Sequence, residues 1–183
     1  MGFDTAAEDL TFIHNLPGRK IIGKGNHDYW WQTMAKLNRF KEELGADSID
    51  FLFNNAYLCE DFIIAGTRGW TLEANYSEED LKIVNREAGR LRMSLEAAKK
   101  LGETTLGAET VVFLHYPPSF GGIVCRQLVD VMHEYGVKRC FYGHIHSVNP
   151  AILDRFADDI PIYCISADLI GFKPMKLNKF QAV

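Results

Sequence analysis

The chain has 183 residues, of which 47% are hydrophobic, so we expect one core and a single domain spanning residues 1–183. Twenty basic and 24 acidic residues give a formal net charge of −4, which argues against an extended nucleic-acid surface. No apolar run approaches the roughly 18 residues of a membrane span. The four cysteines form no Cys-x-x-Cys pair. We therefore expect a cytoplasmic protein without a membrane partner.

The first part of the chain is expected to hold two helices with a strand between them. A capping-box sequence and helical spacing predict a helix over residues 5–15, which Pro17-Gly18 ends. The apolar run 20–24 predicts a strand. Residues 30–44 predict a second helix, which ends at Gly45.

Short β-type runs and one long helix follow. Runs at 49–53, 57–60 and 62–66, separated by turn residues, predict an antiparallel meander. The sequence Ser77-Glu78-Glu79-Asp80 is typical of a helix start, and an apolar series continues to Gly102. This helix is expected to be the longest element.

The remaining segments predict an α/β arrangement. The strand expected at 110–115 is almost continuously apolar, which indicates burial on both faces. A helix at 123–135 and a strand at 138–142 come next. A hairpin is expected from 151–156 and 160–166, and residues 173–183 are expected to add an edge segment. Together the elements predict one layered α/β domain.

Three of the strand-like runs end in residues that bind metals. Gly25-Asn26-His27-Asp28 follows the first run, His115 ends the second, and Gly143-His144-Ile145-His146 follows the third. Because α/β proteins place their chemistry at the carboxyl ends of strands, these side chains are expected to meet there. The pair of His144 and His146, taken alone, is as often structural as it is a site, but its combination with the other two motifs favours a metal site.

In their order along the chain, these motifs resemble those of the calcineurin-like metallophosphoesterase superfamily. That family carries Asp-x-His, Gly-Asp, Gly-Asn-His-(Asp/Glu), a lone His and Gly-His-x-His, and the last three are present here. The first two do not occur before Gly25. The resemblance therefore implies a layered α-β-β-α sandwich that lacks its first strands, in an N-terminally truncated member of the family.

The resemblance also implies roles for individual residues. Asn26, His115 and His144 would bind one metal ion, and His146 would bind another. His27 would contact phosphate and protonate the leaving oxygen, while Asp28 would orient His27. The implied function is hydrolysis of a small phosphomonoester or phosphodiester at a dinuclear centre of Mn, Fe or Zn. With two family motifs absent, one ion or none, and impaired activity, are also expected outcomes.

Two other functions remain open. A non-catalytic interaction module on the same fold is favoured by the lack of a bridging carboxylate. A mononuclear metal-binding protein would use Asn26, His115 and His144 alone. An exposed sheet edge would additionally favour a homodimer.

Aromatic and basic residues near the motifs admit two interpretations each. Arg68 is either a phosphate ligand or an exposed surface arginine, and the second is preferred. Tyr29, Trp30 and Trp31 either flank a substrate or anchor the second helix in the core, and the second is again preferred.

Overall fold

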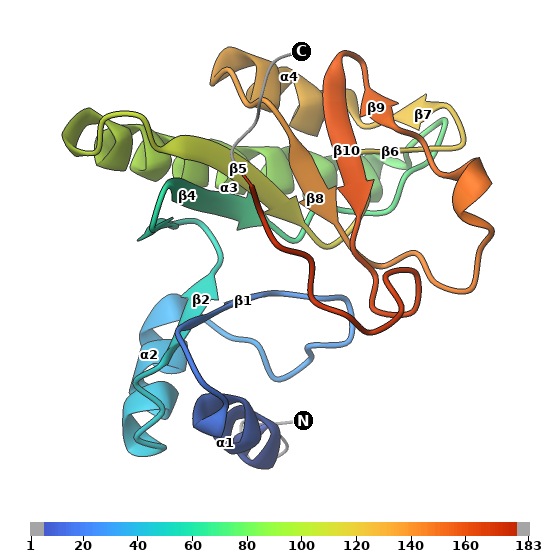
Figure 1. Cartoon of the computed structure of the whole chain (residues 1–183). Helices are drawn as coiled ribbons and strands as arrows, with labels where there is room; N and C mark the ends of the chain where they lie inside the picture. Colours follow the sequence, from blue (N-terminus) through green and yellow to red (C-terminus); the bar gives the residue numbers. More distant parts are fainter. Residues whose placement is uncertain (1–5, 179–183) are drawn as a thin grey trace.

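The computed structural model describes residues 6–178, which form α-β-β-α layers (Figure 1). A six-stranded sheet and a two-stranded sheet form the middle layers. Helices α3 (Glu78–Thr104) and α4 (Arg126–Glu134) cover the larger sheet. Helices α1 (Ala7–Asn15) and α2 (Met34–Glu43) lie beside the smaller sheet on the opposite side. The expected layered α/β fold is confirmed.

The larger sheet is parallel in its centre and antiparallel at both edges. The strands between the edges, β4, β5, β8 and β10, pair in parallel, whereas β3 and β9 pair antiparallel with their neighbours. In spatial order the strands are β3 (Ala56–Cys59), β4 (Phe62–Thr67), β5 (Glu109–Leu114), β8 (Cys140–Tyr142), β10 (Ile160–Cys164) and β9 (Phe156–Ala157). The carboxyl ends of the parallel strands consequently meet at one edge of the sheet.

Strand β5 is buried on both faces, as its apolar sequence predicts. Val112 and Leu114 belong to the main core, which lies between the sheet and helices α3 and α4. Val111 and Phe113 belong to a second cluster on the opposite face. Because successive side chains of a strand point to opposite faces, a continuous apolar run is what this central position requires.

The smaller sheet corrects the expected meander. Strand β2 (Ile49–Leu52) pairs in parallel with β1 (Lys20–Gly23), and it does not pair with β3. Ile49 and Phe51 are buried in a cluster with Leu37 of α2. Burial of this face against the first two helices explains why β2 lies beside β1, whereas β3 and β4 form the expected antiparallel pair.

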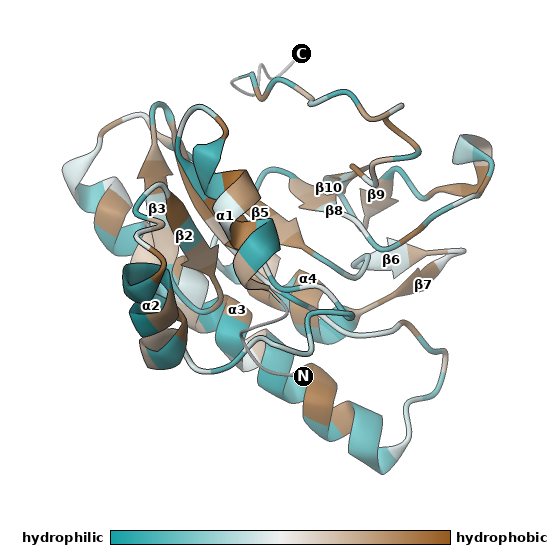
Figure 2. Ribbon diagram, turned by 90° about the horizontal axis from the view of Figure 1, so that it is seen from below, coloured by the Kyte–Doolittle hydropathy of each residue, from teal (hydrophilic) through white to brown (hydrophobic). Residues whose placement is uncertain are grey.

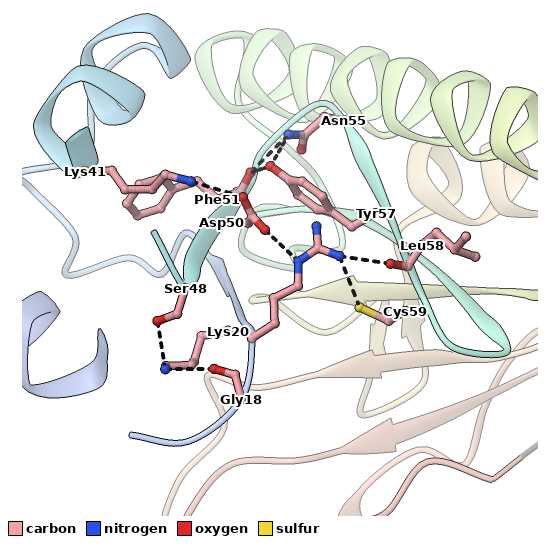
Figure 3. Close-up of polar contacts among 11 residues, drawn as sticks. Gly18, Lys20, Lys41, Ser48, Asp50, Phe51, Asn55, Tyr57, Leu58 and Cys59 are labelled. Carbon is pink, nitrogen blue, oxygen red and sulfur yellow. Dashed lines mark hydrogen bonds and ion pairs between the residues drawn. The ribbon is translucent and has the colours of Figure 1, made fainter. Parts of the chain in front are cut away.

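Polar contacts join the smaller sheet to its neighbours (Figure 3). Asp50 of β2 accepts a hydrogen bond from Arg19 at 2.7 Å and forms an ion pair with Lys41 of α2 at 3.3 Å. The Arg19 guanidinium also donates to the backbone oxygen of Leu58 in β3, at 3.0 Å. The hydroxyl of Tyr57 donates to the Phe51 backbone oxygen at 3.0 Å. These bonds fix the smaller sheet relative to the larger one.

The first two helices are shorter than expected. Thr5, the start of the expected first helix, lies outside the described residues, and α1 runs from Ala7 to Asn15. Helix α2 begins at Met34 because a turn precedes it, in which the Trp31 N–H donates to the Asp28 backbone oxygen. Trp31 is buried in the cluster with α1 and α2, and Trp30 packs against it, which confirms the expected anchoring of these two residues. Tyr29 was expected to anchor as well, but it is 67% exposed because its ring lies outside that cluster.

Elements of the last third also differ from expectation. Helix α4 begins at Arg126 because the preceding residues form a hairpin of β6 (Ser119–Phe120) and β7 (Ile123–Val124). A 3₁₀ turn, η2 (Pro150–Ile152), occupies the start of the first arm of the expected 151–166 hairpin, and only Phe156 and Ala157 pair with β10. Residues 173–178 form no strand, and the rest of the expected edge segment lies outside the described residues.

Hydrophobic residues are concentrated in strands such as β2 and β5, whereas α2 and α3 carry many hydrophilic residues (Figure 2). Helix α3 has 27 residues, begins at an N-cap where Ser77 accepts the Asp80 N–H, and continues to Thr104. The expected long helix is thereby confirmed. None of the helices within residues 6–178 combines the length and the apolar character that crossing a membrane requires.

Candidate metal centre

The candidate site lies where parallel strands of the larger sheet end. His115 directly follows β5, and Gly143-His144 directly follows β8. The backbone ladder continues past the strand ends, since His115 N–H donates to the Arg68 oxygen at 3.0 Å and Gly143 N–H donates to the His115 oxygen at 3.1 Å. The loop that contains Asn26 comes from β1 of the smaller sheet. Both sheets therefore contribute to the site.

Three donor atoms from these three segments converge. Asn26 Oδ1 lies 2.7 Å from Nε2 of His115. Nδ1 of His144 lies 3.2 Å from the same nitrogen. The structure thus brings together three of the four residues that the sequence singled out as metal ligands, although they are as far as 118 positions apart along the chain (144 minus 26).

His115 is held at the centre of this cluster. Burial, followed by the neighbouring His144, lowers the pKa of His115 to about 4, so the ring is neutral at neutral pH. A Cβ atom on Gly25 would lie 3.5 Å from His115 Cε1, and one on Gly143 would lie 3.9 Å from its Nδ1. The Tyr116 ring packs against His144, with centroids 4.3 Å apart. Neutral imidazole is the form that binds metal.

His144 has an unusual backbone conformation. Its φ of +69° lies in the left-handed region, which a non-glycine residue rarely adopts and which costs about 1–3 kcal/mol. The turn is tight, because the Ile145 N–H donates to the Gly143 oxygen at 2.8 Å. Strain of this kind is concentrated at functional sites, where the surrounding structure holds the residue in place.

In the loop after β1, the carboxylate of Asp28 contacts other groups than His27, which it was expected to orient. Its carboxylate accepts the Gly25 N–H at 2.5 Å and the Trp30 indole N–H at 3.2 Å, rather than a hydrogen bond from His27. Asp28 therefore holds the loop that carries Asn26. The His27 side chain is exposed and meets Tyr29 edge to face, with centroids 6.1 Å apart.

His146 follows His144 by two positions, and its side chain has a different partner. Its side chain is 61% exposed, and its Nδ1 lies 2.8 Å from Asp168 Oδ1. The other carboxylate oxygen of Asp168 accepts the Ser147 N–H at 2.7 Å. Asp168 was not predicted as a site residue from the sequence. Its position after a strand could have identified it, because β10 is a parallel strand like those that precede the other site residues, and Asp168 follows its end.

Positive charge lies near the cluster. Arg68 was expected to be an exposed surface residue, but its side chain is only 18% exposed. The guanidinium carbon is 4.6 Å from the centroid of the Trp70 ring, and one nitrogen is 3.9 Å from the buried Glu87 carboxylate. Burial, followed by Arg68, lowers the pKa of Lys24. Arg68 also contributes to the lowered pKa of His115, which places its charge close to the donors.

A cavity of about 440 Å³ separates the two sheets next to the cluster. His115 and Gly143 contribute to its lining, together with Lys24 and Arg19. Apolar side chains of both sheets line it as well, namely Ile21, Leu52, Ile64, Phe113, Leu114 and Ile165. The histidine cluster thus borders a largely apolar space between the sheets.

The donor set fits one cation. Among residues 6–178, no three His, Cys, Asp or Glu side chains are arranged to hold a metal ion. The convergent set instead combines two imidazoles with the amide oxygen of Asn26. Mn, Fe and Zn accept mixed nitrogen and oxygen ligands, and three protein ligands leave positions for water or substrate. Of the ligands expected for a second ion, the structure offers His146.

The fold and the site define a layered α/β protein with metal-type donors at the carboxyl edge of a parallel sheet. A family model described as calcineurin-like phosphoesterase matches residues 3–148, a range that contains all four expected ligands. The chain therefore belongs to the calcineurin-like phosphoesterase family, as its motifs predict, and phosphoester hydrolysis is the general activity of that family. Comparisons with curated proteins and with solved structures gave no match.

Proposed function

We propose that this chain is a metal-dependent phosphohydrolase that acts on a small phosphomonoester or phosphodiester. One observation carries the proposal: Asn26 Oδ1, His115 Nε2 and His144 Nδ1 converge from three loops. These atoms would hold Mn, Fe or Zn. When bound, the ion supplies Lewis acidity, which polarises the phosphoryl group and activates water near neutral pH.

The surrounding residues bind and orient the substrate. Lys24 and Arg68 contribute positive charge beside the donors, which favours an anionic phosphate ester. His27 is exposed on the same loop as Asn26, and it lies close enough to His144 to help lower the pKa of that ring. We therefore expect His27 to contact a phosphate oxygen and to donate a proton to the leaving oxygen.

Hydrolysis of nitrophenyl phosphate and bis(nitrophenyl) phosphate, with added Mn²⁺ or Zn²⁺, tests the proposal. A general acid typically contributes 10²- to 10⁴-fold, so His27→Ala should lower kcat within about that range. His133→Ala is the control, because His133 lies on α4 and pairs with Asp158 and Asp159. Both this chain and any longer reading frame that contains it should be assayed. Inactivity of both, or equal activity of the two variants, would contradict the proposal.

A second candidate function is an interaction module on the same fold. Two observations favour it: within residues 6–178 no carboxylate completes a metal-binding group with the three donors, and the cavity between the sheets is largely apolar. Ile21 and Ile22 of β1 are only partly buried although both are apolar. A second copy of the chain, bound along β1, would bury them. Sedimentation equilibrium distinguishes the functions, because the module predicts a dimer that forms without metal.

A further inference from the structure

The His146 ring has a defined orientation at an otherwise exposed position. Its Nδ1 lies 2.8 Å from Asp168 Oδ1. An ionised carboxylate can only accept hydrogen bonds, so Nδ1 must carry the ring proton. In the neutral imidazole, the lone pair is then on Nε2. Asp168 thereby selects which nitrogen of His146 is free to bind a ligand.

Two parallel strands place this pair. Strand β8 leads to His146, and the neighbouring β10 leads to Asp168, with Cys164 of β10 opposite Tyr142 of β8. After β10 the chain folds into a turn, in which the Ile170 N–H donates to the Ser166 oxygen at 3.1 Å. The carboxylate is 31% exposed, so partly shielded from water. The position of Asp168 is thus set by the sheet as well as by its contact with His146.

The second oxygen of Asp168 fixes the backbone on which His146 sits. It accepts the N–H of Ser147, whose φ is +56°. His144, three residues earlier, also has a positive φ, so the chain between them follows an unusual path. One carboxylate therefore holds both the ring of His146 and the peptide that follows it. The backbone bond and the ring bond together restrict His146 more than either would alone.

Asp154 is an aspartate that only supports a loop, and it differs from Asp168 in its partners. Asp154 also uses one carboxylate oxygen to hold a backbone, since it accepts the Gly122 N–H at 3.2 Å and the Ser119 hydroxyl at 2.6 Å. Neither of these partners is a metal-type donor. Asp168 instead contacts a histidine next to the donor cluster, and it lies beyond residues 3–148, which the family model matches.

We propose that Asp168 is a positioning residue that holds His146 with Nε2 free to ligate a cation at the site. This role rests on the proposed function. Carboxylates that accept the second ring N–H of a metal-binding histidine fix its tautomer and raise its basicity. Loss of such a partner typically lowers metal affinity or activity by about 10- to 100-fold.

Nitrogen-15 NMR of the histidine rings tests the proposal on the full chain, with Zn²⁺ as the probe. In the metal-free protein, His146 should be protonated on Nδ1, and Asp168→Asn should shift the proton toward Nε2. The zinc concentration that half-shifts the Nε2 signal should rise about 10- to 100-fold in this variant. Asp154→Asn, the matched control, should leave both observations unchanged.

The outcomes separate the two proposals. A metal-free His146 that is protonated on Nε2, or a tautomer and zinc response that Asp168→Asn leaves unchanged, overturns the role of Asp168. An Nε2 signal that no zinc concentration shifts overturns it as well. Failure of zinc to shift the His115 ring overturns the proposed function instead. Should Asp168→Asn not fold, the tautomer and zinc response of the unsubstituted chain still decide.

Discussion

Replacing Gly25 with alanine should weaken the site through the loop that carries Asn26. A Cβ atom at this position would lie 3.1 Å from Asp28 Oδ2, which is closer than ordinary van der Waals contact. The same oxygen accepts the Gly25 N–H. The carboxylate must therefore move by a few tenths of an ångström, and its hydrogen bond to Gly25 is weakened.

The expected magnitude follows from that bond. Complete loss of a hydrogen bond to a charged group costs about 1.5–3 kcal/mol, so partial loss should lower the free energy of unfolding by about 1 kcal/mol relative to a glycine-to-alanine change that leaves this bond intact, since both changes share the same gain in unfolded-state entropy. The Cβ would lie at an ordinary van der Waals distance, 3.5 Å, from His115 Cε1, so the effect on metal binding comes from displacement of the loop that carries Asn26. We expect Gly25→Ala to weaken zinc affinity about tenfold, which corresponds to about 1.4 kcal/mol of binding free energy.

Gly23→Ala is the matched control for this prediction. Gly23 lies two residues earlier, and a Cβ atom there would have no other atom within 4 Å. Its substitution should leave zinc affinity unchanged and should stabilise the fold by about 0.4–1 kcal/mol, because alanine reduces the entropy of the unfolded chain. Urea denaturation and zinc titration measure both quantities. Two variants that are equal in stability and in zinc affinity would refute the reasoning.

Three substitutions test the fold. Gly66→Ala should lower the free energy of unfolding by about 3 kcal/mol or more, because the added Cβ would lie 1.9 Å from the Phe113 backbone oxygen. A soluble variant with an unchanged melting temperature would contradict the packing of β4 on β5. Gly89→Ala, in an open position of α3, should stabilise by about 1 kcal/mol and raise the melting temperature by about 2–4 °C. Ser77→Ala should cost about 1 kcal/mol in urea denaturation by removing the N-cap of α3, and no measurable loss would mean that the Asp80 N–H finds another partner.

The sequence predicted the elements whose signals are local. Strand β5 has a continuous apolar run, and helix α3 has both a capping serine and a long apolar series, so their positions were recovered closely. The partner of β2 was not recovered. Its pairing with β1 depends on burial of Ile49 and Phe51 against helices that lie earlier in the chain. Such tertiary packing leaves no mark within the short run itself.

The candidate site was predictable where residues directly follow strands. Asn26, His115 and His144 were found because each follows a short apolar run, and the fold brings the carboxyl ends of those strands together. Asp168 was missed because three residues separate it from the end of β10 and it belongs to none of the three motifs. The contacts of Asp28 with the Gly25 N–H and the Trp30 indole were not predictable, because they depend on the path of the loop.

Calorimetric titration of the metal-free chain with Zn²⁺ tests most directly whether three distant side chains form one cation site. The account predicts at least one ion per chain in the unsubstituted protein, and loss of this binding in His115→Ala, with His133→Ala unaffected. Circular dichroism of each variant establishes that it is folded. An unsubstituted chain that binds no zinc, or a folded His115→Ala variant that binds zinc with unchanged affinity, would contradict the account.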